Sequence, residues 1–148
     1  MTRSSTRVTR SGERGAALVE MAAVVGLLAL LLFGIITYGV TMSYKQTMSQ
    51  AANEAARAAA VAPADLAVAR ATAAADRAIG GYGTPCNTGK GLTCTFVIDP
   101  CAGSTGSRCM TVRLTYDLRG HPRVPSIPGV RQTLPDQLVA TAVVEVTG

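Results

Sequence analysis

The sequence predicts an α+β protein with a long N-terminal helix that continues into a stalk, a short second helix and a small antiparallel sheet. Three observations predict this class. An uninterrupted apolar run lies near the N-terminus, an alanine-rich segment follows it, and three strand-like runs occupy the remainder. Apolar residues make up 48% of the 148 residues but aromatic residues only 4%, so the core is expected to be mostly aliphatic.

The formal net charge of +5 is concentrated at the N-terminus. Residues 1–15 contain four Arg and one Glu, and residues 16–40 contain a single charged side chain, Glu20. The remaining residues, 41–148, contain ten Lys or Arg and seven Asp or Glu. A nucleic-acid surface needs clustered cations, often with stacking aromatic side chains. No such cluster follows residue 15, so we expect no nucleic-acid partner.

The apolar run predicts a transmembrane helix over residues 16–40. Sixteen residues from Met21 to Ile36 pass without a polar side chain, and residues 37–40 extend the run to twenty. Such a helix spans about 30 Å, the thickness of a bilayer core. The four preceding Arg place the N-terminus in the cytoplasm and residues 41–148 outside it. A cleaved secretory signal peptide is the alternative, but its apolar run is usually about 7–15 residues long.

Glu20 lies inside this apolar run, where an ionised carboxylate is costly and tends to have a partner or a function. Cleavage between Gly15 and Ala16 would create a free amine on Ala16 and make Glu20 the fifth residue of the mature chain. That amine and that carboxylate are natural partners, within one chain or between stacked chains. The alternative is a glutamate at the membrane edge that extends to water.

This junction resembles the signal of type IV pilins and pseudopilins, in which a prepilin peptidase cuts after a Gly that ends a basic leader. The stretch RGAALVEMAAVVGLLALLLFGIITYGV, followed by QAANEAARAAAVAP, is similar to the TadE-like family of tight-adherence (Tad, or Flp) pilus systems. The resemblance implies processing at Gly15 and Ala16, and a role for Glu20 in setting the register between subunits. It also implies a pilin-like fold and a place in a bacterial surface fimbrium that serves adhesion or Tad secretion.

The resemblance further implies several partners: other pilin or pseudopilin subunits through the N-terminal helix, the prepilin peptidase, pilus assembly membrane proteins and the lipid bilayer. Two alternatives stay open. One is an unprocessed single-pass membrane scaffold of the pilus machine, and the other is a membrane-tethered extracytoplasmic binding module.

Beyond the membrane, strong helix formers continue to Val61, and Pro63 interrupts them. A second helix is expected over residues 64–79, with Asp65 in its first turn and Gly80 and Gly81 at its end. Its apolar stripe is expected to comprise Leu66, Ala69 and Ala73, with Val68 and Ile79 as further candidates. The predicted organisation is therefore a leader at 1–15, a membrane helix at 16–40, extracytoplasmic helices at 41–80 and a β-rich head at 81–148.

Strands are expected over residues 94–99, 110–118 and 138–146. In the second run, Val112, Leu114, Tyr116 and Leu118 alternate with polar residues, which predicts an antiparallel sheet with one covered face. The connection before the last strand contains four Pro and is expected to be irregular.

All four cysteines, at positions 86, 94, 101 and 109, fall on the side predicted to be extracytoplasmic, where their even number favours two disulfides. We favour the local pairing Cys86–Cys94 with Cys101–Cys109, while crossed and nested pairings stay open. A zinc site is the other alternative, although the intervals of seven, six and seven residues lack the close pairs typical of structural zinc.

No catalytic constellation is present in the sequence. His121 is the one histidine and lies in a Pro-flanked loop, where a solvated side chain is expected, and the acidic residues are scattered. There is no phosphate-binding glycine motif and no C-x-x-C motif. We therefore expect a structural component, with no enzymatic activity, no cofactor and no metal.

Overall fold

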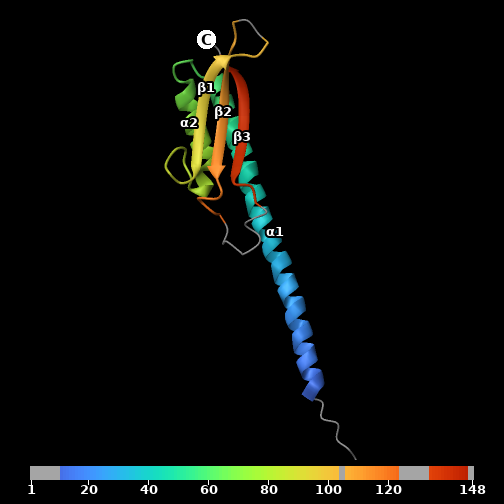
Figure 1. Cartoon of the computed structure of the whole chain (residues 1–148). Helices are drawn as coiled ribbons and strands as arrows, with labels where there is room; N and C mark the ends of the chain where they lie inside the picture. The colour runs from blue at the N-terminus through green and yellow to red at the C-terminus, as the bar shows by residue number, and fades with distance from the viewer. Residues whose placement is uncertain (1–10, 104–105, 124–133, 147–148) are drawn as a thin grey trace, which may run out of the picture. The chain divides into compact units, whose positions relative to one another are not determined.

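The computed structural model describes residues 11–103, 106–123 and 134–146 (Figure 1). Its elements are the helices α1 (Ser11–Ala60) and α2 (Ala67–Ile79), a 3-10 turn (Gly80–Tyr82), and the strands β1 (Leu92–Pro100), β2 (Arg108–Asp117) and β3 (Gln137–Val146). The predicted α+β class is confirmed. The chain forms two units, Met1–Tyr38 and Gly39–Gly148, which we call the first unit and the second unit. Helix α1 begins in the first unit and ends in the second.

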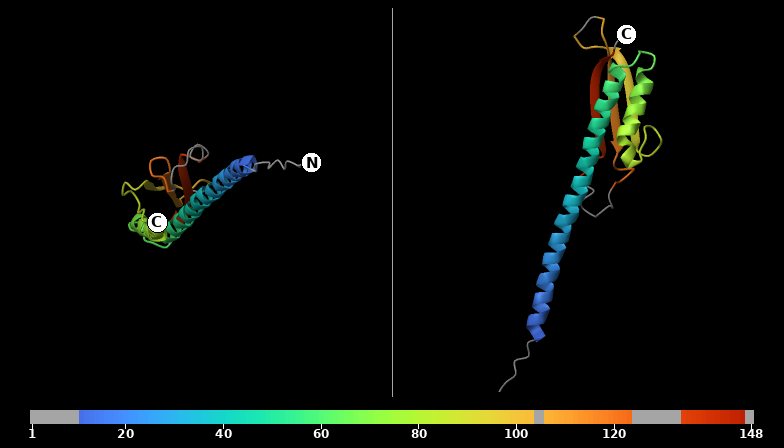
Figure 2. Two further views of the ribbon diagram at one scale, coloured as in Figure 1. Left: turned by 90° about the horizontal axis from the view of Figure 1, so that it is seen from below. Right: turned by 180° about the vertical axis from the view of Figure 1, so that it is seen from behind.

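The second unit is a two-layer structure in which two helices cover one face of a three-stranded sheet. The strand order is β1-β2-β3 and both pairings are antiparallel, with Leu114 of β2 opposite Cys94 of β1 and Ala140 of β3. Figure 2 shows α2 and the part of α1 that belongs to this unit on the same face of the sheet. The other face carries the alternate residues of each strand, which are exposed in β1 and β3 and mostly half-buried in the central strand β2.

The covered face of the sheet follows the alternation seen in the sequence. Val112, Leu114, Tyr116 and Leu118 are all buried, as predicted, and Met110 extends their row. Alternation works here because successive side chains of a strand point to opposite faces, and one face lies against the helices.

Helix α1 contributes a stripe of mostly small side chains to this core. The buried side chains recur three or four residues apart: Tyr44, Met48, Ala51, Ala52, Ala55, Ala56 and Ala59. This spacing is that of one helix face. Because most of them are methyl groups, the backbone of α1 lies close to the elements that it packs against.

The prediction for α2 was wrong in two respects. The helix begins at Ala67, because residues 64–66 form a turn in which the Leu66 amide donates to the Pro63 carbonyl (2.9 Å). Asp65 therefore precedes the helix. The predicted stripe is also wrong except for Ile79, since Leu66, Val68, Ala69 and Ala73 are exposed. The buried residues are instead Ala67, Ala71, Ala74, Ala75 and Ile79. With alanine at most positions, hydropathy does not mark which face is buried.

The predicted strands are present, and their bounds differ from the predicted ones by one or two residues, the usual uncertainty at strand ends. The Pro-rich connection before β3 lies largely in residues 124–133, and most of the basic leader lies in residues 1–10. Both of these stretches are outside the described residues.

Two disulfides join neighbouring segments of the second unit: Cys86–Cys94, with a Cα–Cα distance of 5.4 Å, and Cys101–Cys109, with 4.9 Å. No cysteine is free. The first bond ties the segment before β1 to β1, and Asn87 reinforces it. Asn87 Oδ1 accepts from the Cys94 amide (3.0 Å), and Asn87 Nδ2 donates to the Cys94 carbonyl (3.1 Å). The second bond closes the end of the β1–β2 hairpin.

Alkylation of the native full-length protein without a reductant should modify none of the four cysteines. Replacing both Cys86 and Cys94 with Ser should lower the free energy of unfolding by about 2–4 kcal/mol, because the bond constrains the unfolded chain. Mass spectrometry measures the first outcome and chemical unfolding in detergent the second. Alkylation of two or more cysteines in the native protein would contradict the presence of two disulfides.

Ala55→Leu should destabilise the second unit by about 1–3 kcal/mol, because Ala55 is fully buried and a larger side chain overfills its site. The matched control is Ala73→Leu on the exposed face of α2, which should change stability by less than about 0.5 kcal/mol. Near-ultraviolet circular dichroism during urea unfolding of the full chain reports the packing around its tyrosines. Equal effects of the two variants would show that the stripe on α1 is not tightly packed.

Candidate functional site

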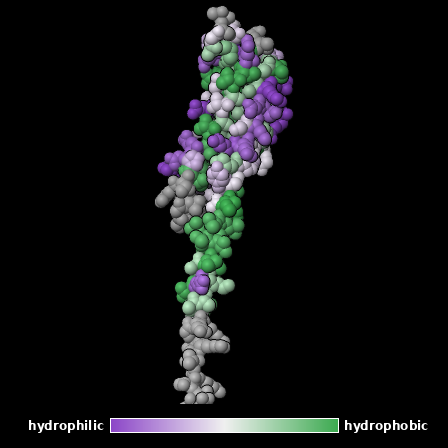
Figure 3. Space-filling model, turned by 90° about the vertical axis from the view of Figure 1, so that its right-hand side faces the viewer, coloured by the Kyte–Doolittle hydropathy of each residue, from purple (hydrophilic) through white to green (hydrophobic). Residues whose placement is uncertain are grey.

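Residues 15–36 of α1 are apolar apart from Glu20, and almost all of them are exposed. Residues 15–28 are all exposed, and large side chains such as Leu18 and Ile35 are 70% and 71% exposed. Figure 3 shows the resulting apolar surface in green along this helix. Among the described residues, α1 is the one helix long and apolar enough to cross a membrane, and none of its most apolar stretch is buried. A core helix of a soluble protein would be covered, so this stretch is suited to lipid or to partner helices.

Gly15, Ala16 and Glu20, the residues predicted for processing and register, all lie in α1 and are all exposed. Ala16 and Glu20 are four residues apart, so they lie one above the other on the same side of the helix. If the chain is cut after Gly15, the new amine stands at the start of the helix and Glu20 lies in its first turn. A carboxylate is favoured there by the helix dipole as well as by the amine.

The second unit contains a cluster that the sequence did not reveal, in which three tyrosines surround one arginine. The Arg123 guanidinium carbon lies 4.7 Å, 5.0 Å and 5.9 Å from the ring centroids of Tyr44, Tyr116 and Tyr82. The ring of Tyr44 meets those of Tyr82 and Tyr116 edge to face, with centroids 4.9 Å and 4.7 Å away. The four residues come from α1, the 3-10 turn, β2 and the segment after β2.

Hydrogen bonds hold each tyrosine of this cluster in place, including one between the Tyr82 hydroxyl and Ser43 Oγ (3.1 Å). The Tyr44 hydroxyl pairs with Thr84 Oγ1 (3.0 Å), and the Tyr116 hydroxyl donates to the His121 carbonyl (2.7 Å). Arg123 Nη1 donates to the Tyr82 carbonyl (3.1 Å). Within the described chain, Arg123 Nε and Nη2 are buried without a hydrogen-bond partner. The ring faces compensate for them, because aromatic quadrupoles attract a cation.

Two phenols of this cluster have pKa values that are shifted in opposite directions. The pKa of Tyr82 falls below its ordinary value of 10.0, chiefly because of its hydrogen bond with Ser43. Burial raises the pKa of Tyr116 above 10.0, and the nearby charge of Arg123 opposes that rise. The arrangement joins four segments of the second unit around one cation.

His121 is exposed, and its amide donates to the Asp117 carbonyl (3.2 Å). Within the part of the chain that the structure describes, no group of three or more His, Cys, Asp or Glu side chains is arranged to hold a metal ion. Two shallow grooves flank α1 in the second unit, one toward α2 with a volume of about 520 Å³ and one toward β3 with about 410 Å³.

One comparison with known protein families finds a similarity in α1. The model of the TadE-like protein family matches residues 15–57, a segment that contains Gly15, Ala16 and Glu20 and ends within α1. The predicted TadE-like resemblance is therefore confirmed for this segment. No curated protein and no solved structure matches the chain.

Arg123→Met should lower the free energy of unfolding by about 1–2 kcal/mol, because it removes a partly desolvated cation from three ring faces. It should also raise the pKa of Tyr116 further, since Arg123 opposes the effect of burial. Chemical unfolding measures the first change and ultraviolet titration of the phenols the second.

The sign of the pH dependence follows from the raised pKa of Tyr116. As the pH rises through 10.0, the unfolded chain loses this phenol proton before the folded chain does, so the contribution of Tyr116 to stability declines.

The control for Arg123→Met is Arg119→Met. Arg119 pairs with Asp136 at an exposed position, so its loss should lower the free energy of unfolding by only about 0–1 kcal/mol. Equal destabilisation by the two variants would contradict the role of the cluster.

Proposed function

We propose that this chain, whose residues 15–57 are TadE-like, is a membrane-anchored pseudopilin-like component or assembly factor of a Tad-type pilus. One observation carries the proposal: the family match coincides with an exposed apolar helix of membrane-spanning length. Such a helix is stable in lipid or against the apolar helices of other pilus subunits, and not in water. The four Arg of the leader favour a cytoplasmic N-terminus and an extracytoplasmic second unit.

In this proposal, Glu20 sets the axial register between the membrane helices of neighbouring subunits. A carboxylate at the helix centre costs about 2.5–3.5 kcal/mol on the insertion scale and less near the interface, so it needs a partner. After cleavage at Gly15, the amine of Ala16 supplies one, on the same chain or on an adjacent subunit. A charged pair in a low dielectric is strongly dependent on alignment, because breaking it leaves an unpaired charge.

An unprocessed membrane scaffold of the same pilus machine is the second candidate. The observation that favours it is that the Gly15–Ala16 bond lies inside α1, which begins at Ser11. A peptidase that binds an extended chain must first unwind that end of the helix. Neither candidate requires catalysis, and we propose no cofactor.

The proposal predicts different failures for two variants at the junction. Gly15→Leu should block processing, so the protein keeps the mass of the leader and stays in the membrane. Glu20→Gln preserves the side-chain shape without its charge. It should therefore insert normally and be processed, but enter filaments less. The measurements are the mass of the mature chain and its amounts in the membrane fraction and in sheared surface filaments.

Matched controls lie in the second unit. Gly80→Leu adds the same side chain where nothing lies within 4 Å of its Cβ position, and Glu145→Gln makes the same charge change on an exposed strand position. Both should behave as the parent protein does. Normal incorporation of both junction variants would remove the pseudopilin proposal and support the unprocessed scaffold.

A further inference from the structure

Both lysines of the chain lie at one end of the second unit, the end where α1 enters it, which we call the entry end. Lys45 is on α1, two residues after Ser43, whose hydroxyl pairs with the Tyr82 hydroxyl (3.1 Å). Lys90 is held at the same end, because its Nζ donates to the carbonyl of Gly83, the residue after Tyr82 (3.4 Å). Both lysine side chains are exposed.

The acidic side chains at the entry end do not neutralise these lysines. Within the described residues, neither lysine forms a salt bridge. Asp136 pairs with Arg119, and Asp117 Oδ1 accepts from the amides of Arg119 (3.1 Å) and Gly120 (3.0 Å). The Asp76 carboxylate accepts a backbone amide (2.7 Å). The two ammonium groups are therefore open to an anion that is supplied from outside the chain.

Lys45 follows closely on the predicted membrane helix. Five helical residues separate it from Val40, where that helix is expected to end, and they rise by about 8 Å. Side chains of a helix lean toward its N-terminus, so the Lys45 ammonium is directed back toward the predicted bilayer surface. Tyr38, at the predicted boundary, is 62% exposed, and tyrosine is enriched at membrane–water interfaces. The entry end is thus within reach of lipid headgroups.

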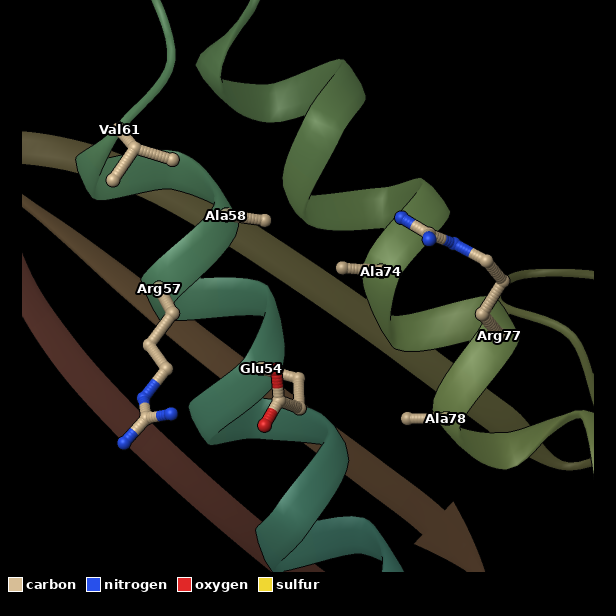
Figure 4. Close-up of a pocket in the computed structure, with 7 residues that line it drawn as sticks. All are labelled: Glu54, Arg57, Ala58, Val61, Ala74, Arg77 and Ala78. Atoms are coloured by element: carbon tan, nitrogen blue, oxygen red, sulfur yellow. The ribbon is translucent and has the colours of Figure 1, made fainter.

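Charged surfaces elsewhere in the second unit are mixed in sign. The shallow groove between α1 and α2 contains Glu54 together with Arg57 and Arg77 (Figure 4). At the other end of the unit, Arg108 of β2 lies one position along the ladder from the pair that includes Asp99 of β1. Opposite charges so close together reduce the attraction of either surface for an anion.

We propose that the entry end rests on the extracytoplasmic surface of the bilayer, where Lys45 and Lys90 bind the phosphate groups of anionic phospholipids. An ammonium group is a compact charge with three donors on a flexible stem, which suits a headgroup of variable position. Near a membrane surface, each lysine strengthens the attraction to anionic lipid by about fivefold. The inference rests on the proposed membrane anchoring and identifies a lipid surface as a partner of the second unit.

Amine labelling of the full chain in vesicles tests the contact directly. Lys45 and Lys90 carry the chain's side-chain amines, and Arg108→Lys adds an exposed reference amine at the other end of the unit. A neutral amine reagent and mass spectrometry give the labelling rate of each position. Relative to position 108, both lysines should react about fivefold more slowly in phosphatidylcholine–phosphatidylglycerol vesicles than in phosphatidylcholine alone. Salt at about 1 M should remove most of the difference, because it screens surface charges.

Charge removal provides an independent measurement. A dye at Thr88→Cys, an exposed position near Lys90, transfers energy to acceptor-labelled headgroups, and the native cysteines are all in disulfides. Phosphatidylglycerol should increase this transfer in the parent chain, and Lys45→Gln with Lys90→Gln should abolish the increase. The matched control, Arg57→Gln with Arg108→Gln, removes two exposed charges elsewhere and should preserve it. Figure 4 shows the Arg57 side chain directed away from α2.

Equal relative labelling in the two lipid mixtures would overturn the inference. An equal loss of energy transfer in the lysine and arginine variants would do so as well, because it would reflect net charge alone. Flotation of the parent chain with the vesicles separates the two proposals. A chain that does not float removes both the anchoring and the lipid contact, whereas a chain that floats with unprotected lysines removes only the contact.

Discussion

The contact of α1 with α2 and the sheet through methyl-sized side chains is the constraint on which the second unit depends. Ala51, Ala55 and Ala59 are completely buried, and Ala71 and Ala75 of α2 are buried in the same core. Alanine permits close packing but removes little apolar area from water per residue. A small unit built this way needs additional links, as small domains in general do. The two disulfides and the Arg123 cluster supply them. The Cys101–Cys109 bond lies at one end of β2, and the cluster lies near the other end, where Cys94 of the first disulfide is paired with Leu114.

The Arg123 cluster adds stability to a core that buries little apolar area. Aromatic residues are only 4% of the chain, yet three of its four tyrosines surround this one guanidinium. Rings around a cation add attraction that their buried area alone does not provide. The cluster joins α1 to β2 and to the 3-10 turn after α2, so it fixes both layers of the unit where α1 enters it. The two phenols lie in different environments, so their pKa values shift in opposite directions. Tyr82 is hydrogen-bonded to side-chain hydroxyl groups, which lowers its pKa, whereas Tyr116 is buried, which raises its pKa.

The sequence predicted what depends on local patterns and missed what depends on tertiary contacts. The apolar run predicted the exposed helix, and the alternation from Val112 to Leu118 predicted the covered face of β2. The stripe on α2 failed because alanine occupies both faces of that helix, so the choice of the buried face depends on what α1 offers. The Arg123 cluster had no signal, because its tyrosines lie about 35 to 40 residues apart and follow no period. The α1–α2 groove likewise requires two helices to be placed before Glu54 and Arg77 are seen to share it.

One continuous helix, α1, carries a segment that is exposed and apolar and a segment that packs against the second unit. This restricts its sequence more than the sheet restricts the sequences of its strands. Apart from Glu20, residues 15–36 are apolar on every side, whereas residues 44–59 place mostly small side chains on the buried side and polar ones on the other. The family match covers residues 15–36 and most of residues 44–59, and it ends at Arg57, three residues before the helix does. Many sequences satisfy a three-stranded sheet that is closed by two disulfides, since alternation and loop closure suffice. Fewer satisfy a helix that changes from an all-round apolar surface to an alanine-faced one. The TadE-like match thus falls on the helix that carries this double requirement.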